Sequence, residues 1–222
     1  MKNVTWSSRF TKQIDAEVLE FSQSLSIDIV LYDVDIRVTI AHVEMLAKCG
    51  HIKPSECKKI IVGLNKVKKL ADNGKLPWSV DYEDVHMNIE NALTKIVGDV
   101  GKKIHLGRSR NDLVTTDLRL YLRDFIDIYL HKIRETKYVL ATMAIEFSDS
   151  LFPGFTHMQI AQPVTFGHHL LAWNEMLSRD EQRLENTRDV INVLPLGSAA
   201  LSGTSLKIDR NMVAKKLGFK KV

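Results

Sequence analysis

The chain has 222 residues, 45% of them hydrophobic, enough to bury a substantial core in one large domain or two small ones. Its net charge is +4, from 31 basic and 27 acidic residues that alternate without forming a basic block, which disfavours nucleic acid as a partner. Two cysteines, Cys49 and Cys57, form no disulfide framework and fit no zinc spacing, so we expect reduced thiols and no metal.

The amino-terminal residues and the apolar windows bear on location. Residues 1–10 contain no apolar run, and no window approaches the length that a membrane span requires. We therefore expect a cytoplasmic protein with no membrane partner.

The dominant signal along the chain is helical. Between residues 28 and 48, apolar residues recur every three or four positions, and a glycine follows as a stop. These residues are Leu31, Val34, Val38, Ala41 and Met45. Pro54 suits the first turn of a second helix that runs to about Ala71, where Asn73 and Gly74 signal a turn. A shorter helix is predicted over residues 83–96.

The longest predicted helix covers about residues 116–148, which contain no glycine or proline. Apolar residues outside its main stripe indicate burial on more than one side. The stripe comprises Leu118, Leu122, Phe125, Tyr129, Ile133, Leu140, Met143 and Phe147, and the others are Leu120, Ile126 and Leu130. Further helices are predicted over about 163–190 and from about 209. Helices this long are typical of a bundle or an oligomeric core, and without competing strand patterns the predicted fold class is all-α.

Three polar stretches lie at predicted helix ends, and the first is His105–Asp112. A loop that leads into a helix presents unpaired N–H groups and the positive end of the helix dipole, which favours bound anions. Arg108 and Arg110 add forked donors suited to a carboxylate or phosphate, and Asn111 can both donate and accept. Taken alone, the simpler explanation is that Asp112 caps the helix and the arginines are solvated or ion-paired.

The other two stretches each contain a histidine. In Pro153–Pro163, His157 could transfer protons or donate to an anion near neutral pH, although a lone loop histidine is more often structural. In Asp81–Glu90, His86 and Glu90 share one helical face, either to orient the histidine or as an ordinary surface pair. A small-residue run over 197–205 fits either a tight turn against a ligand or a plain connector.

Taken together in chain order, these stretches resemble the argininosuccinate lyase family of the fumarase/aspartase superfamily. Gly107–Asp112 is similar to the signature G-R-S-R-N-D-Q, except that Leu113 replaces the usual glutamine. Pro153–Pro163 resembles P-G-[YF]-T-H-[LM]-Q-x-A-Q-P, and Glu83–Glu90 looks like E-D-[VI]-H-x-x-x-E. Further matching segments are Trp6–Phe10, with serines in place of the glycines in W-G-G-R-F, Leu194–Ser198 and Ile208–Arg210.

The resemblance implies an amino-terminal helical domain, residues 1–107, and the first long helices of a central bundle, residues 108–222, within a homotetramer. It also implies a reversible β-elimination, without a cofactor, of the small molecule argininosuccinate to arginine and fumarate. A base removes a proton beside a carboxylate, and an acid protonates the departing guanidinium nitrogen. Because the developing dianion needs fixed donors more than the ground state does, clustered arginine and amide groups suit this chemistry.

Site residues follow from the matching motifs. By resemblance, Ser109, Arg110 and Asn111 hold carboxylate and amino-acid groups of the substrate. Ser24 and Asp28 match positions that contact the arginine portion.

The second set of implied residues lies near the fumarate portion. Thr156 and His157 are the implied catalytic residues, with His157 placed for hydrogen bonding or proton relay, and Gln159 binds substrate beside them. His86 would line a neighbouring wall of the active site.

The family's third signature, G-S-S-x-M-P-x-K-x-N-P, is absent from these residues. In the family it supplies the serine assigned as the base and a lysine for the substrate, and each active site combines signatures from three subunits. We therefore expect this chain, as an amino-terminal half, to be inactive or nearly so by itself. We also expect its long helices to expose apolar surface that self-association or a second chain must cover.

Three alternatives stay open. Another fumarate-releasing lyase, of the adenylosuccinate lyase, aspartase or fumarase type, is the nearest enzyme rival, although the R-S-R-N-D and T-H-M-Q forms favour argininosuccinate. A non-catalytic, crystallin-like structural remnant would keep the fold without the reaction. A generic helical adaptor would explain the periodicity but not the ordered polar loops.

Overall fold

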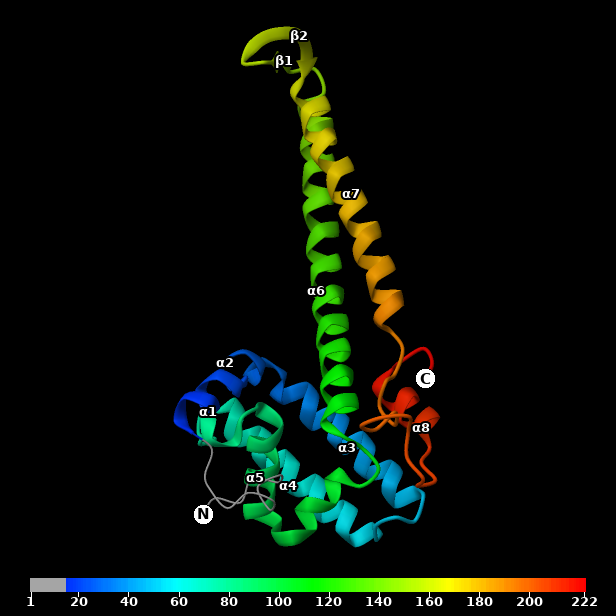
Figure 1. Cartoon of the computed structure of the whole chain (residues 1–222). Helices are drawn as coiled ribbons and strands as arrows, with labels where there is room; N and C mark the ends of the chain where they lie inside the picture. Colours follow the sequence, from blue (N-terminus) through cyan, green and yellow to red (C-terminus); the bar gives the residue numbers. More distant parts are fainter. Residues whose placement is uncertain (1–14) are drawn as a thin grey trace. The chain divides into compact units, whose positions relative to one another are not determined.

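A computed structural model describes residues 15–222, and helices dominate it (Figure 1). The chain divides into two compact units: unit 1 comprises the residues up to 121 together with 193–222, and unit 2 comprises residues 122–192. The prediction of an all-α fold class is confirmed, with one small hairpin in addition. The domain boundary predicted at residue 107 lies inside unit 1 and stays a prediction. Among the described residues, no helix combines the length and apolar character needed to cross a membrane.

Unit 1 is built around helix α3 (Tyr32–Lys48), which packs against α4 (Pro54–Asp72), α5 (Val85–Val97) and α8 (Arg210–Leu217). Its other elements are α1 (Ala16–Ser22), α2 (Leu25–Asp28), the first part of α6 (Arg110–Glu146), and the 3-10 helices η2 (Ile29–Leu31), η3 (Val80–Tyr82) and η4 (Gly98–His105). The apolar stripe predicted along α3 is buried, as expected. The polar residues Asp35, Thr39 and His42 are buried as well, so partners from other elements must satisfy them.

Capping residues decide where two of the helices begin. Helix α5 starts at Val85 because Asp84 Oδ1 accepts the N–H of Met87 at 2.8 Å. Helix α6 starts at residue 110, earlier than the predicted start near 116. There Ser109 Oγ accepts the N–H of Asn111 at 3.3 Å, and Ser109 N donates to Asp112 Oδ1 at 2.9 Å.

Unit 2 contains an antiparallel hairpin where the sequence predicted a connection without strands. Strand β1 (Leu151–Thr156) pairs with β2 (Gln159–Thr165), with Pro153 opposite Pro163 and an irregular register after it. Prolines inside both strands argue against a ladder, and the turn residues His157 and Met158 lack the usual Asn-Gly signal, which explains the wrong prediction. The helix expected to start at Pro163 therefore begins after β2, as α7 (Phe166–Ile191), with Thr165 as its cap.

Within unit 2, α7 runs antiparallel beside the later part of α6 (Figure 1). Ion pairs cross between the two helices, including Arg188 with Asp127 and Lys137 with Glu181. The buried apolar residues of α6 here are Ile126, Leu130 and Ala144. No residue of the predicted main stripe is fully buried: most are half-buried, and some are exposed, including Phe125 at 43% and Tyr129 at 49%. Within the chain, therefore, α6 is covered on one side only in this unit.

Gly167 allows the start of α7 to lie against the end of α6. A Cβ atom at this position would lie 2.3 Å from the carbonyl oxygen of Ala144. Gly167→Ala should therefore destabilise the chain by about 1–3 kcal/mol through overpacking, although alanine is the better helix former. Urea unfolding measures the change, with the exposed Glu175→Ala on the same helix as the control. A gain in stability for Gly167→Ala would contradict this packing.

Candidate functional site

Several of the predicted site residues meet where α5 begins. Ser24 Oγ donates to Asp28 Oδ2 at 2.6 Å, and Asp28 Oδ1 accepts the N–H of Val85 at 3.1 Å. The N–H of Ser24 donates to the carbonyl of Glu83 at 2.9 Å. The segment 24–28 is therefore fixed against the first turn of α5, which itself carries His86.

Arg110 reaches the same place from the start of α6. Its Nη1 lies 2.5 Å from Asp84 Oδ2 and 3.5 Å from Glu83 Oε2. Asp84 thus both caps α5 and orients the guanidinium. Within the described part of the chain, Nε and Nη2 of Arg110 donate to no recorded acceptor, and the side chain is 29% exposed. One edge of the guanidinium is therefore held by protein carboxylates while the other is left for an anion.

His86 is buried and faces two carboxylates. Its Nδ1 is hydrogen-bonded to Asp35 Oδ2 and lies 3.5 Å from Asp117 Oδ2. Burial, the largest single influence, lowers the pKa of His86, but the hydrogen bond and charge of Asp35, with two further carboxylates, outweigh it and the pKa is raised. The three ligand atoms lie within 4.8 Å of one another. Because Arg108 already brings positive charge to these carboxylates, we interpret them as an internal charge cluster rather than as metal ligands.

Arg108 and His42 hold the loop before α6 from inside. Arg108 is buried and donates Nη1 to Thr39 Oγ1 at 2.9 Å, so this arginine faces the core and is not placed to bind a ligand. His42 Nε2 is bonded to the carbonyl of Leu106 at 2.8 Å, which requires Nε2 to carry a proton and donate it. The sequence suggested both arginines as anion donors. The structure separates them, with Arg108 as an anchor and Arg110 as the candidate.

Asp112 joins the start of α6 to the small-residue run. Its Oδ2 accepts the N–H groups of Gly197 at 2.8 Å and Ala199 at 2.7 Å. Beside it, the exposed Asn111 donates Nδ2 to the carbonyl of Ala200 at 3.2 Å. Arg210 holds the segment just before this run by donating to the carbonyls of residues 194–196. The run is therefore a rigid loop that adjoins Ser109 and Asn111.

The remaining predicted site residues lie in unit 2, at the tip of the hairpin. Thr156 and Gln159 are the last paired residues, and His157 and Met158 form the turn between them. All four side chains are exposed. The predicted residues thus fall into two groups, one in each unit, and the Trp6–Phe10 motif lies outside the described residues.

Backbone strain coincides with the polar stretches. In residues 15–222, the non-glycine residues with positive φ are Glu83, His157, Met158, Ala199 and Ser202. They lie in the polar stretches 81–90 and 153–163 and in the small-residue run 197–205, and none lies in the polar stretch 105–112. Such conformations cost about 1–3 kcal/mol each and cluster at functional sites. At His157 and Met158 the positive φ follows from the two-residue hairpin turn, so these two outliers by themselves assign no function.

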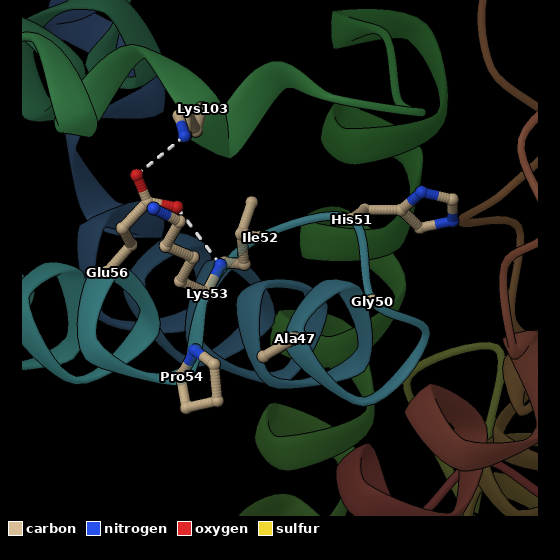
Figure 2. Close-up of a pocket in the computed structure, with 8 residues that line it drawn as sticks. All are labelled: Ala47, Gly50, His51, Ile52, Lys53, Pro54, Glu56 and Lys103. Atoms are coloured by element: carbon tan, nitrogen blue, oxygen red, sulfur yellow. Dashed lines mark hydrogen bonds and ion pairs between the residues drawn. The ribbon is translucent and has the colours of Figure 1, made fainter.

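A surface pocket of about 450 Å³ lies elsewhere on unit 1, where α3 turns into α4 (Figure 2). Its lining includes His51, Lys53 and Lys103, and an ion pair of 2.6 Å joins Lys103 to Glu56 across it. None of the predicted site residues lines this pocket. At the amino terminus of α4, the backbone N–H of Lys53 already has an acceptor, because it donates to Glu56 at 3.0 Å.

Comparison with known proteins places the chain in a family. A family model described as lyase matches residues 8–222. The chain belongs to this lyase family. It is 49% identical over 219 residues to the argininosuccinate lyase of Chromohalobacter salexigens, and 52% identical over 217 residues to that of Pseudomonas syringae pv. tomato. These alignments cover 99% and 98% of the chain but only 47% of each relative, so the chain spans about half the length of the curated relatives it matches.

Solved structures of other proteins agree with the fold. An EDDS lyase in complex with formate is 30% identical with a TM-score of 0.78, and the match covers 92% of the chain and 40% of that protein. A β-carboxy-cis,cis-muconate cycloisomerase from Acinetobacter calcoaceticus has a TM-score of 0.71 at 21% identity, which speaks to the fold alone. The match covers 93% of the chain and 49% of the cycloisomerase.

Sequence reasoning missed the residues that hold the predicted ones. Asp35, Asp84 and Asp117 contact or closely approach His86 and Arg110, yet none was named as a site residue. A signal existed for the first, because Asp35 and Thr39 are polar positions on a helix whose neighbours are apolar on both sides. No comparable signal marks Asp117, since its helix is polar at many positions.

His42 should make the chain sensitive to acid. Burial lowers the pKa of His42 to about 3, with the charge of Arg108 acting in the same direction. A depressed pKa means that the neutral ring stabilises the fold fully above the unfolded pKa near 6.5. That contribution is lost as pH falls towards 3, by up to about 1.4 kcal/mol per pH unit.

The slope of unfolding free energy against pH between 6.5 and 4 measures this effect. We expect His42→Gln to flatten it by about one proton. Equal slopes for wild type and His42→Gln would contradict the assignment.

Proposed function

We propose that this chain forms part of an argininosuccinate lyase that eliminates fumarate from argininosuccinate and releases arginine. The observation that carries the proposal is the free edge of Arg110 beside Asp28, Ser24 and His86, on a chain about 50% identical to argininosuccinate lyases. A guanidinium held by Asp84 on one edge is a preorganised donor for a carboxylate on the other.

The residues near the start of α5 have different proposed roles, which follow from their chemistry. Arg110 binds a substrate carboxylate, with Ser109 and Asn111 donating beside it. Asp28 and Ser24 form an acidic and hydroxyl pair suited to the cationic guanidinium portion of the substrate. The rigid loop over 194–200 keeps Asn111 in place, so the donors meet the developing negative charge without reorganisation.

The hairpin supplies the second group of proposed residues. Thr156, His157 and Gln159 present exposed polar groups on a strained turn, which suits residues that complete a site with other chain segments. We propose that His157 donates a hydrogen bond or relays a proton near the fumarate portion. We propose that the serine base and the lysine that binds the substrate come from sequence that this chain does not contain.

A chimera tests the activity. The chain would be joined to the part of the Pseudomonas syringae pv. tomato argininosuccinate lyase that it does not match, and fumarate formation from argininosuccinate would be followed by absorbance. We expect activity from the chimera and none from the 222-residue chain alone. Arg110→Ala should lower kcat/KM by about 100-fold or more, as expected for the loss of a bidentate carboxylate partner.

The matched control is Arg183→Ala, an exposed arginine that pairs only with Asp180 among the described residues. Its chimera should keep full activity. A folded chimera that ignores argininosuccinate but cleaves adenylosuccinate, aspartate or malate would assign the chain to a sister activity. A folded chimera inactive on all of these would favour the structural remnant.

We further propose that the exposed apolar surface of unit 2 is covered by other copies in a homo-oligomer, a tetramer in the complete protein. The exposed apolar residues, which lie on more than one side of α6, are Phe125, Ile128, Tyr129, Tyr138, Val139, Ile145, Trp173 and Met176. So many large apolar side chains on one helix pair are unusual for a free surface and typical of an interface between helices.

Light scattering after gel filtration tests the interface. The wild-type chain should have a mass above that of a monomer, and Ile145→Lys, at a position 78% exposed, should lower it by placing a charge in the contact. Glu146→Lys, at the adjacent exposed position, is the control for added charge. A monodisperse wild-type monomer at every concentration would contradict the proposal.

A further inference from the structure

The most unusual group in unit 1 is the carboxyl of Asp117 on α6. The residue is 0% exposed, and neither of its side-chain oxygens has a hydrogen-bond donor in the described chain. A buried carboxylate without a donor is among the most costly groups a core can contain. Arg108 donates its Nη1 to Thr39 and its Nε has no partner in the described chain, so its charge acts on Asp117 without a hydrogen bond between them.

Asp117 lies beside a second carboxylate. Asp35, on α3, is 2% exposed, and both carboxylates approach the same nitrogen of His86 on α5. Two carboxylates this close in a buried site cannot both ionise at low cost, and one retains its proton. Asp35 has the direct hydrogen bond to the imidazole, so the proton belongs on the other member.

We propose that Asp117 is held as a neutral acid that donates its proton to Asp35, and that Asp35 alone carries the charge that orients His86. Asp117 and Asp35 are then positioning residues for His86. Asp35 accepts from Nδ1–H, which fixes the direction of the ring, and the acid proton of Asp117 fixes the carboxylate of Asp35 in turn. Only the relevance of this ring to catalysis rests on the function proposed above.

The charges around the cluster agree with one neutral member. His86 is faced by Asp35 from α3 and Asp117 from α6, and it also feels Asp84 at the start of α5 and Asp28 from α2. Arg108, from the loop before α6, acts on Asp35 and Asp117 together. Burial, and then the charge of Asp35, raises the pKa of Asp117 well above its usual range, against the lowering effect of Arg108. A neutral Asp117 removes the repulsion between the carboxylates and leaves the pull of Asp35 on His86 intact.

Infrared spectroscopy of the wild-type chain tests the acid directly. At pH 7 we expect a carbonyl band of a protonated carboxyl group that shifts on ¹³C labelling of aspartate. The band should vanish in Asp117→Asn and persist in Asp127→Asn, which removes a partly exposed carboxylate of unit 2. A wild-type spectrum without the band would overturn the proposal, whether or not any variant folds.

Titration of His86 by ¹⁵N NMR tests the orienting role. Asparagine resembles a neutral aspartic acid, so Asp117→Asn should leave the titration midpoint of His86 unchanged. Asp35→Asn should lower it by about 1–3 pH units through loss of the charge partner. If Asp117 is a carboxylate instead, its replacement 3.5 Å from Nδ1 should lower the midpoint by a similar amount, which would overturn the proposal.

A purely structural role for Asp117 would change stability but would predict neither the infrared band nor the unequal effects on His86. None of these readouts involves substrate. An inactive chimera would therefore count against the proposed function alone, and an absent band against this inference alone.

Discussion

Unit 1 depends on one constraint, which is that α3 carries polar side chains on a face that the fold buries. A helix surrounded on both sides must find partners for those groups inside the protein, because each unpaired polar group costs free energy. Asp35 is hydrogen-bonded to His86 on α5, and Thr39 accepts a hydrogen bond from Arg108 in the loop before α6. His42 donates a hydrogen bond to the carbonyl of Leu106. The three contacts fix α5 and the start of α6 against α3.

The candidate site follows from that fixation. Once Arg108 is anchored inside, Arg110, two residues on, reaches the carboxyl group of Asp84 at the start of α5. Asp84 and Asp28 accept N–H groups from the first turn of the same helix, so both carboxylates gain from its dipole while they hold neighbouring segments. The polar residues of the site are therefore positioned by a buried network rather than by the loop alone.

Unit 2 is different, because its two helices cover each other on one side and expose many large apolar side chains elsewhere. Aromatic residues secure the base of the hairpin, where Phe152 stacks on His169 with ring centroids 5.4 Å apart. At the tip, His157 and Met158 have positive φ, as a two-residue hairpin turn requires, although neither is a residue type that favours it. Many exposed apolar side chains are expected where a chain contributes to a larger assembly.

The sequence by itself determined the helical class, the order of the helices and the three polar stretches, because apolar periodicity and motif spacing are local properties. The apolar stripe predicted on α3 is buried, whereas no residue of the main stripe predicted on α6 is fully buried, since periodicity cannot say which partner covers a face. The hairpin was missed because two prolines and a His-Met turn conceal the ladder.

Only the tertiary structure decided which arginine is buried, which carboxylates hold His86, and that Asp112 ties α6 to the loop at 197–199. Asp35, His86 and Asp117 are far apart in the sequence. Contacts between them depend on how three helices pack, and no local pattern encodes that packing.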